Sequence, residues 1–293
     1  MTRTSLAVLS LVLAAFLFGA TFVVVKDAIT ALPPLGFVGW RFTIGAAVLL
    51  AVSRPKARQA AIAGIVGGLW LFAGYAFQTK GLVTTTASNS GLVTGLYVVF
   101  TPLLAAAVGR RRPRPLVVTG ALVAFGGLAV LTMSSTLTLQ SGDLSTIAGA
   151  VGFAGHIVYL SRVAHRYPVV AFTGVQLAVV GVLGLTSSAL FEDFTLPGSE
   201  SVTALLVTGI AVGAGAFLLQ VWSQTVLGPS RTVLILALEP AFAALTGAVV
   251  LGERLGMRGG IGALLILAGI YVVLTATGPE DDLPTAESLS AAH

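Results

Sequence analysis

The sequence has no cysteine and little charge: only 9% of its 293 residues are Asp, Glu, Lys or Arg. The absence of cysteine excludes disulfides, thiolate metal sites and cysteine nucleophiles. Soluble domains carry about 25% charged residues, because a globule must cover itself with polar surface. This chain instead has 56% hydrophobic residues and a mean hydropathy of +0.98. The composition predicts an all-α membrane protein that lipid surrounds over most of its length.

Motifs for ATP use and for hydrolysis are also absent. The chain contains no Walker A, HExxH or GxSxG sequence. We therefore expect neither ATP-driven pumping by this chain alone nor an intramembrane hydrolase site. The formal net charge of +5 is typical of the basic loops that orient membrane proteins, and we expect no nucleic-acid partner. We also expect no cofactor and no bound metal.

Ten apolar segments follow one another, each near the length of about 20 residues that a spanning helix needs. The first resembles a signal peptide, but its apolar run continues to Val25, which favours an uncleaved span. Residues 278–293 change to acidic and small polar types, and we expect a disordered cytoplasmic tail there. The ten segments are 5–25, 34–52, 60–80, 84–108, 115–133, 144–162, 168–190, 203–224, 231–251 and 258–277.

The chain repeats itself. Residues 78–130 and 220–272 align without a gap and share 14 identical positions of 53, among them Gln78/Gln220 and Phe100/Phe242. This self-similarity indicates a duplication. Each copy holds five segments, and because five is an odd number the second copy must cross the membrane in the opposite orientation. We therefore predict ten transmembrane helices as two inverted repeats, residues 1–133 and 144–277.

The basic residues predict the orientation. With the N-terminus in the cytoplasm, eleven Lys and Arg residues fall on the inside and four on the outside, with Arg41 within a span. This is a clear positive-inside bias. Ten spans then return the C-terminus to the cytoplasm. Inverted repeats are an architecture of secondary transporters, in which the two halves exchange conformations around a midplane site.

Polar side chains recur on one face of the fourth segment. Thr86, Ser90, Thr94, Tyr97 and Thr101 follow at spacings of four, four, three and four, which places them on one side of a helix. They can line a cavity, or they can bond back to their own helix or to a neighbour. Two glycines on a neighbouring face, at 91 and 95, indicate close helix packing.

Two titratable residues lie in the middle of predicted spans. Glu239 immediately precedes Pro240 in the ninth segment, and an ionised carboxylate there must be protonated, paired or facing water. His156 lies at the centre of the sixth segment, with Tyr159 on its face. Either residue can carry protons, or each can make a structural hydrogen bond between helices. Metal binding at His156 is not expected, since no second histidine lies at ligand spacing.

Other intramembrane polar residues leave the same choice open. Gln78 and Gln220 occupy equivalent positions of the two repeats, so they either line a cavity or hold helices together, and we favour the second. Arg41 lies seven residues into the second segment, where snorkelling or structural pairing is the favoured interpretation. Lys26 and Lys80 are expected to snorkel at span ends.

Short motifs along the whole chain up to the tail form a recognisable set: Phe18-Gly19-Ala20-Thr21-Phe22, Lys26, Arg41-Phe42, Tyr75-Ala76-Phe77-Gln78, Thr85-Thr86-Ala87-Ser88-Asn89, Leu96, Leu238-Glu239-Pro240 and Leu251-Gly252-Glu253-Arg254. In these residues and their order, the chain resembles the EamA branch of the drug/metabolite transporter superfamily. The resemblance implies two inverted five-helix repeats around a central cavity lined mainly by spans 1, 3, 4, 6, 8 and 9. It also implies efflux or facilitated movement of small metabolites such as amino acids, nucleosides or cationic drugs. The first repeat has Gly109-Arg110-Arg111-Arg112 where the family often has Gly-Glu-Arg, which suggests that Glu253 is a loop feature outside the substrate path.

The sequence thus predicts an inner-membrane secondary transporter, an exporter that works by alternating access as a monomer or homodimer. Protons are the candidate coupling ion, through Glu239 and His156. The alternatives are a membrane enzyme of lipid metabolism and a non-transporting scaffold or receptor. The residues expected to contact the substrate are Thr21, Ser90, Thr94, Tyr97, His156, Tyr159 and Glu239.

Overall fold

The computed structural model describes residues 2–110, 112–132, 141–227, 229–253 and 256–276, and all regular structure among them is helical. The prediction of an all-α fold is confirmed. The predicted tail, residues 278–293, lies outside the described residues. The helices are α1 Arg3–Ala28, α2 Pro34–Val52, α3 Arg58–Leu82, α4 Ala87–Thr94, α5 Tyr97–Val108, α6 Pro115–Thr132, α7 Ser141–Val163, the short η1 Ala164–Arg166, α8 Val169–Phe191, α9 Ser199–Leu206, the π-helical η2 Val207–Ala216, α10 Phe217–Gln224, α11 Pro229–Leu236, α12 Glu239–Val250 and α13 Met257–Ala276.

Seven helical stretches in the described part of the chain are long and apolar enough to cross a membrane. One of them, Asn89–Val108, runs through α4 and α5, and another, Ser199–Gln224, runs through α9, η2 and α10. Three shorter apolar helices accompany them: Pro115–Ala124, Glu239–Val250 and Met257–Val272. All of these lie in or overlap the apolar segments that hydropathy predicts.

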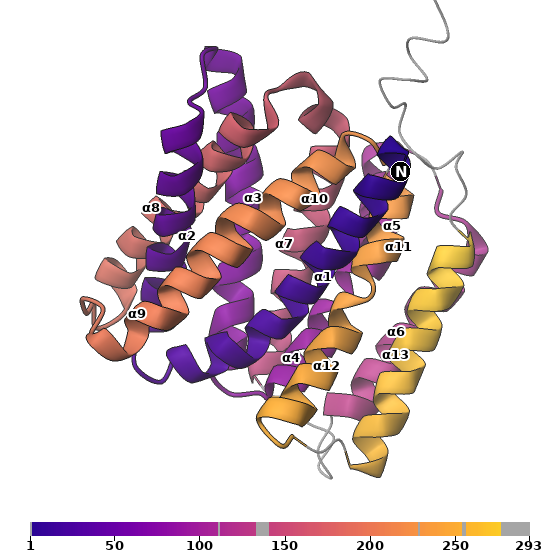
Figure 1. Cartoon of the computed structure of the whole chain (residues 1–293). Helices are drawn as coiled ribbons and strands as arrows, with labels where there is room; N and C mark the ends of the chain where they lie inside the picture. Colours follow the sequence, from indigo (N-terminus) through magenta and orange to yellow (C-terminus); the bar gives the residue numbers. More distant parts are fainter. Residues whose placement is uncertain (1, 111, 133–140, 228, 254–255, 277–293) are drawn as a thin grey trace, which may run out of the picture.

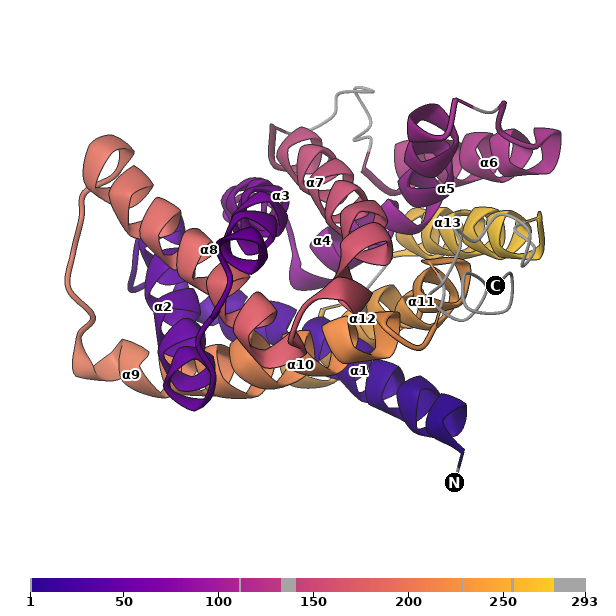
Figure 2. The same cartoon turned by 90° about the horizontal axis from the view of Figure 1, so that it is seen from above.

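Helices from the two halves of the chain pack side by side (Figures 1 and 2). The main pairs are α2 with α8, α3 with α7, and α6 with α13. Glycines let the backbones approach: a Cβ on Gly152 of α7 would lie 2.6 Å from the backbone nitrogen of Gly74 in α3. Because hydrocarbon gives no hydrophobic drive between helices, such close packing of small residues is a main source of their association.

The contact between α6 and α13 is reciprocal. A Cβ on Gly127 would lie 2.7 Å from the Gly262 carbonyl oxygen, and a Cβ on Gly269 would lie 2.5 Å from the Gly120 carbonyl oxygen. Both Gly127/Gly269 and Gly120/Gly262 are pairs 142 residues apart in the sequence. Contacts in which each partner offers the same surface are the mark of two-fold symmetry.

Two helices are interrupted at matching places. The break between α4 and α5 falls at Gly95 and Leu96, and the break between α11 and α12 falls at Ala237 and Leu238, 142 residues later. Pro240 explains the second break, because it has no N–H to donate to the carbonyl of Leu236 four residues earlier. The first break brings a glycine against the Pro240 ring, whose Cβ lies 3.3 Å from the position of a Cβ on Gly95.

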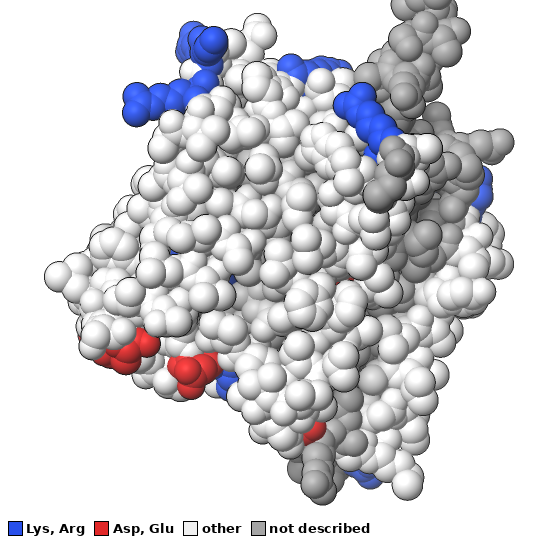
Figure 3. All heavy atoms as spheres, in the orientation of Figure 1, with Lys and Arg blue, Asp and Glu red and all other residues white. Residues whose placement is uncertain are grey.

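On the face shown in Figure 3, charged residues gather at the two ends and an uncharged band lies between them. Most of the Lys and Arg lie at the end that holds the N-terminus, and the Asp and Glu patches lie toward the opposite end beside a few basic residues. The band between them presents large apolar side chains to the outside, such as Leu122, Leu264 and Val249. An apolar belt of this extent is suited to hydrocarbon rather than to water.

Candidate functional site

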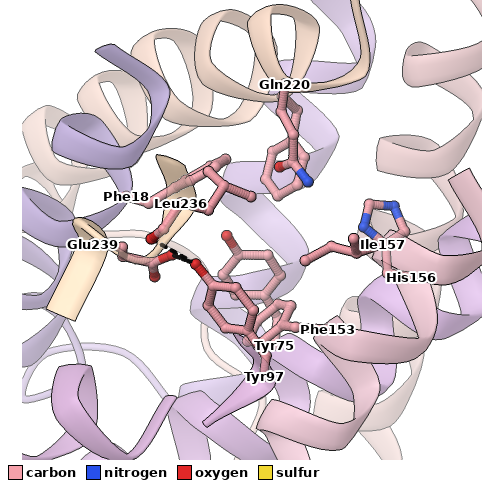
Figure 4. A pocket seen from close by; sticks show the side chains of 10 residues that line it. Phe18, Tyr75, Tyr97, Phe153, His156, Ile157, Gln220, Leu236 and Glu239 are labelled. Atoms are coloured by element: carbon pink, nitrogen blue, oxygen red, sulfur yellow. Dashed lines mark hydrogen bonds between the residues drawn. The ribbon is translucent and has the colours of Figure 1, made fainter. Parts of the chain in front are cut away.

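Two cavities lie within the bundle, with volumes of about 350 and 310 Å³ when the adjoining space open to solvent is included. Phe18 of α1, Tyr75 of α3 and Glu239 of α12 line both. The first cavity is further lined by Tyr97, Phe153, His156, Ile157, Phe217, Gln220 and Leu236 (Figure 4). The second is further lined by Thr21, Phe22, Val25, Arg41, Gln78 and Leu82.

The two cavities extend toward opposite ends of the bundle. Gln220 of the first lies one helical turn before Ser223, whose hydroxyl donates to the Ala7 carbonyl near the start of α1. The second cavity reaches Val25 near the end of α1 and Leu82, the last residue of α3. The residues common to both cavities, Glu239 among them, therefore lie between two chambers that are stacked along the helices.

Glu239 and Tyr97 meet at the two helix breaks. Each is the first residue after its break, and the two are 142 residues apart in the sequence. The Tyr97 hydroxyl lies 2.8 Å from the Leu236 carbonyl oxygen and 3.1 Å from Glu239 Oε2, and both Tyr97 and Glu239 are buried. The Tyr97 hydroxyl donates to the Leu236 carbonyl, and this hydrogen bond replaces the one that the missing N–H of Pro240 cannot make. A side chain from the first half of the chain thus supplies the hydrogen bond that a backbone carbonyl at the helix break in the second half lacks.

His156 faces this pair from across the first cavity (Figure 4). Its Nε2 lies 2.7 Å from Oε1 of Gln176 in α8, and the residue is 1% exposed. On the same side, Gln220 donates from Nε2 to Gln224 within its own helix, at 3.3 Å. His156 therefore combines two predicted roles, since it lines a cavity and also makes a hydrogen bond between helices.

Arg41 lies in the wall of the second cavity and is only 2% exposed. Its guanidinium carbon lies 4.6 Å from the ring centre of Tyr75, 4.8 Å from that of Phe42 and 5.4 Å from that of Phe37. These ring faces partly compensate the buried positive charge through cation–π attraction. The side chain is enclosed by rings, so it does not snorkel to the membrane surface.

Of the seven residues predicted to contact the substrate, four line a cavity and three do not. Tyr97, His156 and Glu239 line the first cavity, and Thr21 with Glu239 lines the second. Three others lie outside both linings. Ser90 is fully buried in α4, Thr94 accepts a hydrogen bond from Nε2 of Gln78 at 3.1 Å, and Tyr159 donates to the Ala63 carbonyl at 3.0 Å.

Two other members of the polar stripe on the fourth segment have local roles. Thr86 is the N-cap of α4 and accepts from the Asn89 backbone N–H, while Thr101 donates back to the Tyr97 carbonyl. The helix break between Thr94 and Tyr97 divides the stripe, so its members do not all share one surface. The two glycines beside it pack α4 against α12, as their spacing predicts.

Two charged residues link helix ends next to the second cavity, which Val25 and Leu82 line. Lys26 Nζ lies 2.7 Å from the carbonyl oxygens of both Leu82 and Thr85, so it ties α1 to the connection between α3 and α4. Glu253 accepts a hydrogen bond from the Ala87 backbone N–H at 2.9 Å, at the N-terminus of α4. The position of Glu253 in the connection after α12 agrees with its prediction as a loop residue.

The aromatic lining was not predicted. Phe18, Tyr75, Phe153 and Phe217 are ordinary membrane residues by type, and only the offset of 142 between Tyr75 and Phe217 marks them as equivalent. Among the described residues no cluster of three or more His, Cys, Asp or Glu side chains could hold a metal ion. The two linings therefore offer an organic molecule contacts with aromatic rings, a carboxyl, an imidazole, two amides and a guanidinium.

Comparisons with known proteins agree with this architecture. The chain matches the EamA-like transporter family over residues 5–133 and again over residues 140–275. It is 32% identical over 269 residues to an uncharacterized transporter of Archaeoglobus fulgidus, covering 90% of this chain and 84% of that protein. It is 27% identical over 273 residues to a Salmonella typhimurium protein named a probable amino-acid metabolite efflux pump, covering 87% of this chain and 90% of that protein.

A solved crystal structure is also similar in three dimensions. It superposes with a TM-score of 0.67 and 25% sequence identity, over 92% of this chain and 96% of that chain. The family match covers nearly all the residues that the structure describes, and it is consistent with the resemblance to drug/metabolite transporters drawn from the sequence motifs. The chain is therefore a multi-pass membrane protein and a member of the EamA-like transporter family.

Proposed function

We propose that this protein is an inner-membrane secondary transporter that exports small organic molecules by alternating access, with Glu239 as its proton-coupling residue. The observation that carries the proposal is the contact between Tyr97 and Glu239, two sequence-equivalent residues that meet where two broken helices and two cavities join. Broken helices at a midplane site between inverted repeats are a recurrent design of secondary transporters.

Three features support ten spans arranged as two inverted repeats, residues 1–133 and 144–277. The breaks in the fourth and ninth apolar segments occur at equivalent residues. The packing of α6 on α13 is reciprocal and antiparallel, since Gly127 approaches Gly262 while Gly269 approaches Gly120. Two other pairs of contacts also correspond: α5 with α7 corresponds to α12 with α1, and α3 with α8 corresponds to η2 with α2.

The single hydrogen of the Tyr97 hydroxyl can couple the protonation of Glu239 to the geometry of the helix break. A phenol has one hydrogen to donate, yet Leu236 O and Glu239 Oε2 both lie within hydrogen-bond distance of it. When Glu239 is protonated, its own O–H can donate to the Tyr97 oxygen, so both contacts are made at once. When Glu239 is ionised, one acceptor loses its hydrogen. Release of the proton from Glu239 thus weakens the contact of Tyr97 either with the carboxylate or with the Leu236 carbonyl. This loss favours a change of conformation at the helix breaks.

The orientation and the direction of transport complete the proposal. The positive-inside bias of the loops supports a cytoplasmic location for both termini. The first cavity, which extends toward the N-terminal end, then faces the cytoplasm, and the second faces outward. Export is favoured by the name of the Salmonella typhimurium relative, an efflux pump. A proton entering from outside through the second cavity can reach Glu239, which lines both chambers.

Transport by purified protein in liposomes tests this function. Labelled L-phenylalanine, L-leucine, uridine and tetraethylammonium are offered in turn, and uptake is measured by exchange and with a pH gradient. We expect the gradient to drive accumulation of at least one probe in wild-type protein. Glu239→Gln should keep exchange but lose the response to the gradient, while Asp193→Asn, an exposed acid between α8 and α9, should behave as wild type.

Two results would count against the proposal. Gradient-driven accumulation by Glu239→Gln equal to that of wild-type protein would remove Glu239 from coupling. The absence of exchange for every probe, in protein shown to be folded, would contradict transport of these compound classes.

A further inference from the structure

We propose that Arg41 recognises a carboxylate on the transported molecule, and that the substrate is a zwitterion whose cationic group lies near Glu239. This inference rests on the proposed transport function and narrows its substrate class. It separates carboxylate-bearing compounds from uncharged nucleosides and from cations without an acid group.

The first ground is the unpaired state of the guanidinium. Arg41 is 2% exposed, its Nε is buried without a hydrogen-bond partner, and no ion pair joins it to any Asp or Glu among the described residues. Arginine stays charged in proteins, since its guanidinium holds its proton over the whole physiological range. A buried charge without a counter-charge is costly, and in a membrane span such a residue marks a substrate or ion pathway.

The second ground is the direction from which an acceptor can approach. The rings of Tyr75, Phe42 and Phe37 lie around the guanidinium carbon, with their centres at 4.6 to 5.4 Å, and the buried Nε finds no hydrogen-bond acceptor among the described residues. Arg41 borders the second cavity, so the cavity is the open side. The planar fork of arginine fits the two oxygens of a carboxylate in a bidentate pair.

The third ground is that a carboxyl and several aromatic rings lie near Arg41, where they can contact the rest of a molecule whose carboxylate binds there. Glu239 lines the second cavity together with Arg41, and it lines the first cavity among the rings of Phe18, Tyr75 and Phe217. A molecule with its carboxylate at Arg41 can place an ammonium group by Glu239 and an apolar side chain among the rings. The amide of Gln78, which lines the second cavity, offers a further polar contact.

The test compares acids with their amides in the same liposome exchange assay. The probes are L-phenylalanine and L-leucine, their amides, which lack the negative charge, and phenethylamine. We expect wild-type protein to exchange the acids roughly 10- to 100-fold faster than the amides, the range that loss of a charge-assisted pair gives. Arg41→Gln should remove this preference, Arg41→Lys should restore part of it, and Arg58→Gln, at an exposed position, should leave it unchanged.

The comparison of acid with amide needs no variant, so a failure of Arg41→Gln to fold leaves the test intact. Equal exchange of amides and acids by wild-type protein would overturn the carboxylate subsite while transport stands. A preference for acids that survives in folded Arg41→Gln would assign it to another residue. No exchange of any probe here, or of uridine and tetraethylammonium, would refute the proposed function itself.

Discussion

The hydroxyl of Tyr97 can be removed without removing its ring, and Tyr97→Phe therefore isolates the hydrogen bond at the helix breaks. In the structure this hydroxyl reaches Leu236 O at 2.8 Å and Glu239 Oε2 at 3.1 Å, and the residue is 2% exposed. Phenylalanine still fills the cavity. The change leaves the Leu236 carbonyl without a donor, because Pro240 has no N–H to replace the phenol.

The magnitude follows from the cost of an unsatisfied buried carbonyl, about 1–3 kcal/mol. The carboxyl of Glu239 faces a cavity, so losing its hydrogen bond to Tyr97 adds less to this free-energy cost. If the bond forms in only one of two alternating states, the whole cost falls on that state. An energy of about 1–3 kcal/mol shifts the equilibrium between the two states by about 5- to 150-fold.

The absence of cysteine makes the assay direct. A single cysteine is introduced at Val25 in the second cavity or at Ile157 in the first. The rate of labelling by a membrane-impermeant maleimide then reports access from each side. We expect Tyr97→Phe to change the two rates in opposite directions, with their ratio altered by about 5- to 150-fold. Tyr271→Phe, at an exposed position of α13, is the matched control and should change the ratio by less than about twofold.

A ratio that stays at the wild-type value would refute the reasoning, because the hydroxyl would then contribute equally to both states. Rates that rise together at both positions would also contradict it, since they would indicate general loosening of the bundle.

Three further changes test the packing around the site. Gly19→Ala should lower the unfolding temperature in detergent, since its Cβ would lie 2.7 Å from the Glu239 carbonyl oxygen and overpacking costs about 1–3 kcal/mol; Gly126→Ala, whose Cβ meets nothing within 4 Å, is the control. Gly127→Ala and Gly269→Ala should lower that temperature by similar amounts because their surroundings are reciprocal, and a large inequality would argue against the two-fold relation. Lys26→Met should speed labelling of the second-cavity cysteine, since it frees the α3–α4 connection, and an unchanged rate would remove Lys26 from closure of that end.

The helices could be predicted from the sequence because their cause is local. Runs of apolar residues near spanning length, with proline at the first position of α2 and α6, set where the helices begin and end. The position of Glu239 in the cavity lining was also accessible, since a carboxyl in the middle of an apolar run has few stable surroundings. Its partner Tyr97 was available from the repeat alone, as the residue 142 positions earlier.

The rest of the site depends on contacts that no local pattern encodes. Ser90 and Thr94 share a helical face with Tyr97 by spacing, yet the break at residues 95 and 96 separates them from both cavity linings. The position of Arg41 in a cavity wall depends on rings supplied by two helices, and the favoured interpretation, snorkelling or structural pairing, did not place it there. The available signal was an arginine within a span between aromatic neighbours.

The difference between Tyr97 and Glu239 has a consequence for the proposed mechanism. Two identical inverted halves would give inward-open and outward-open states of equal free energy, since exchanging the halves converts one state into the other. Two ionised glutamates at these positions would repel each other, and two tyrosines would both keep their protons at neutral pH and could not exchange them. In the proposed mechanism, one of each gives a hydrogen bond between the halves and a single carboxyl whose proton makes the free energies of the two states unequal. On this reasoning Glu239→Gln leaves two states without proton control, and Tyr97→Phe leaves a carboxyl that no longer acts on the helix break.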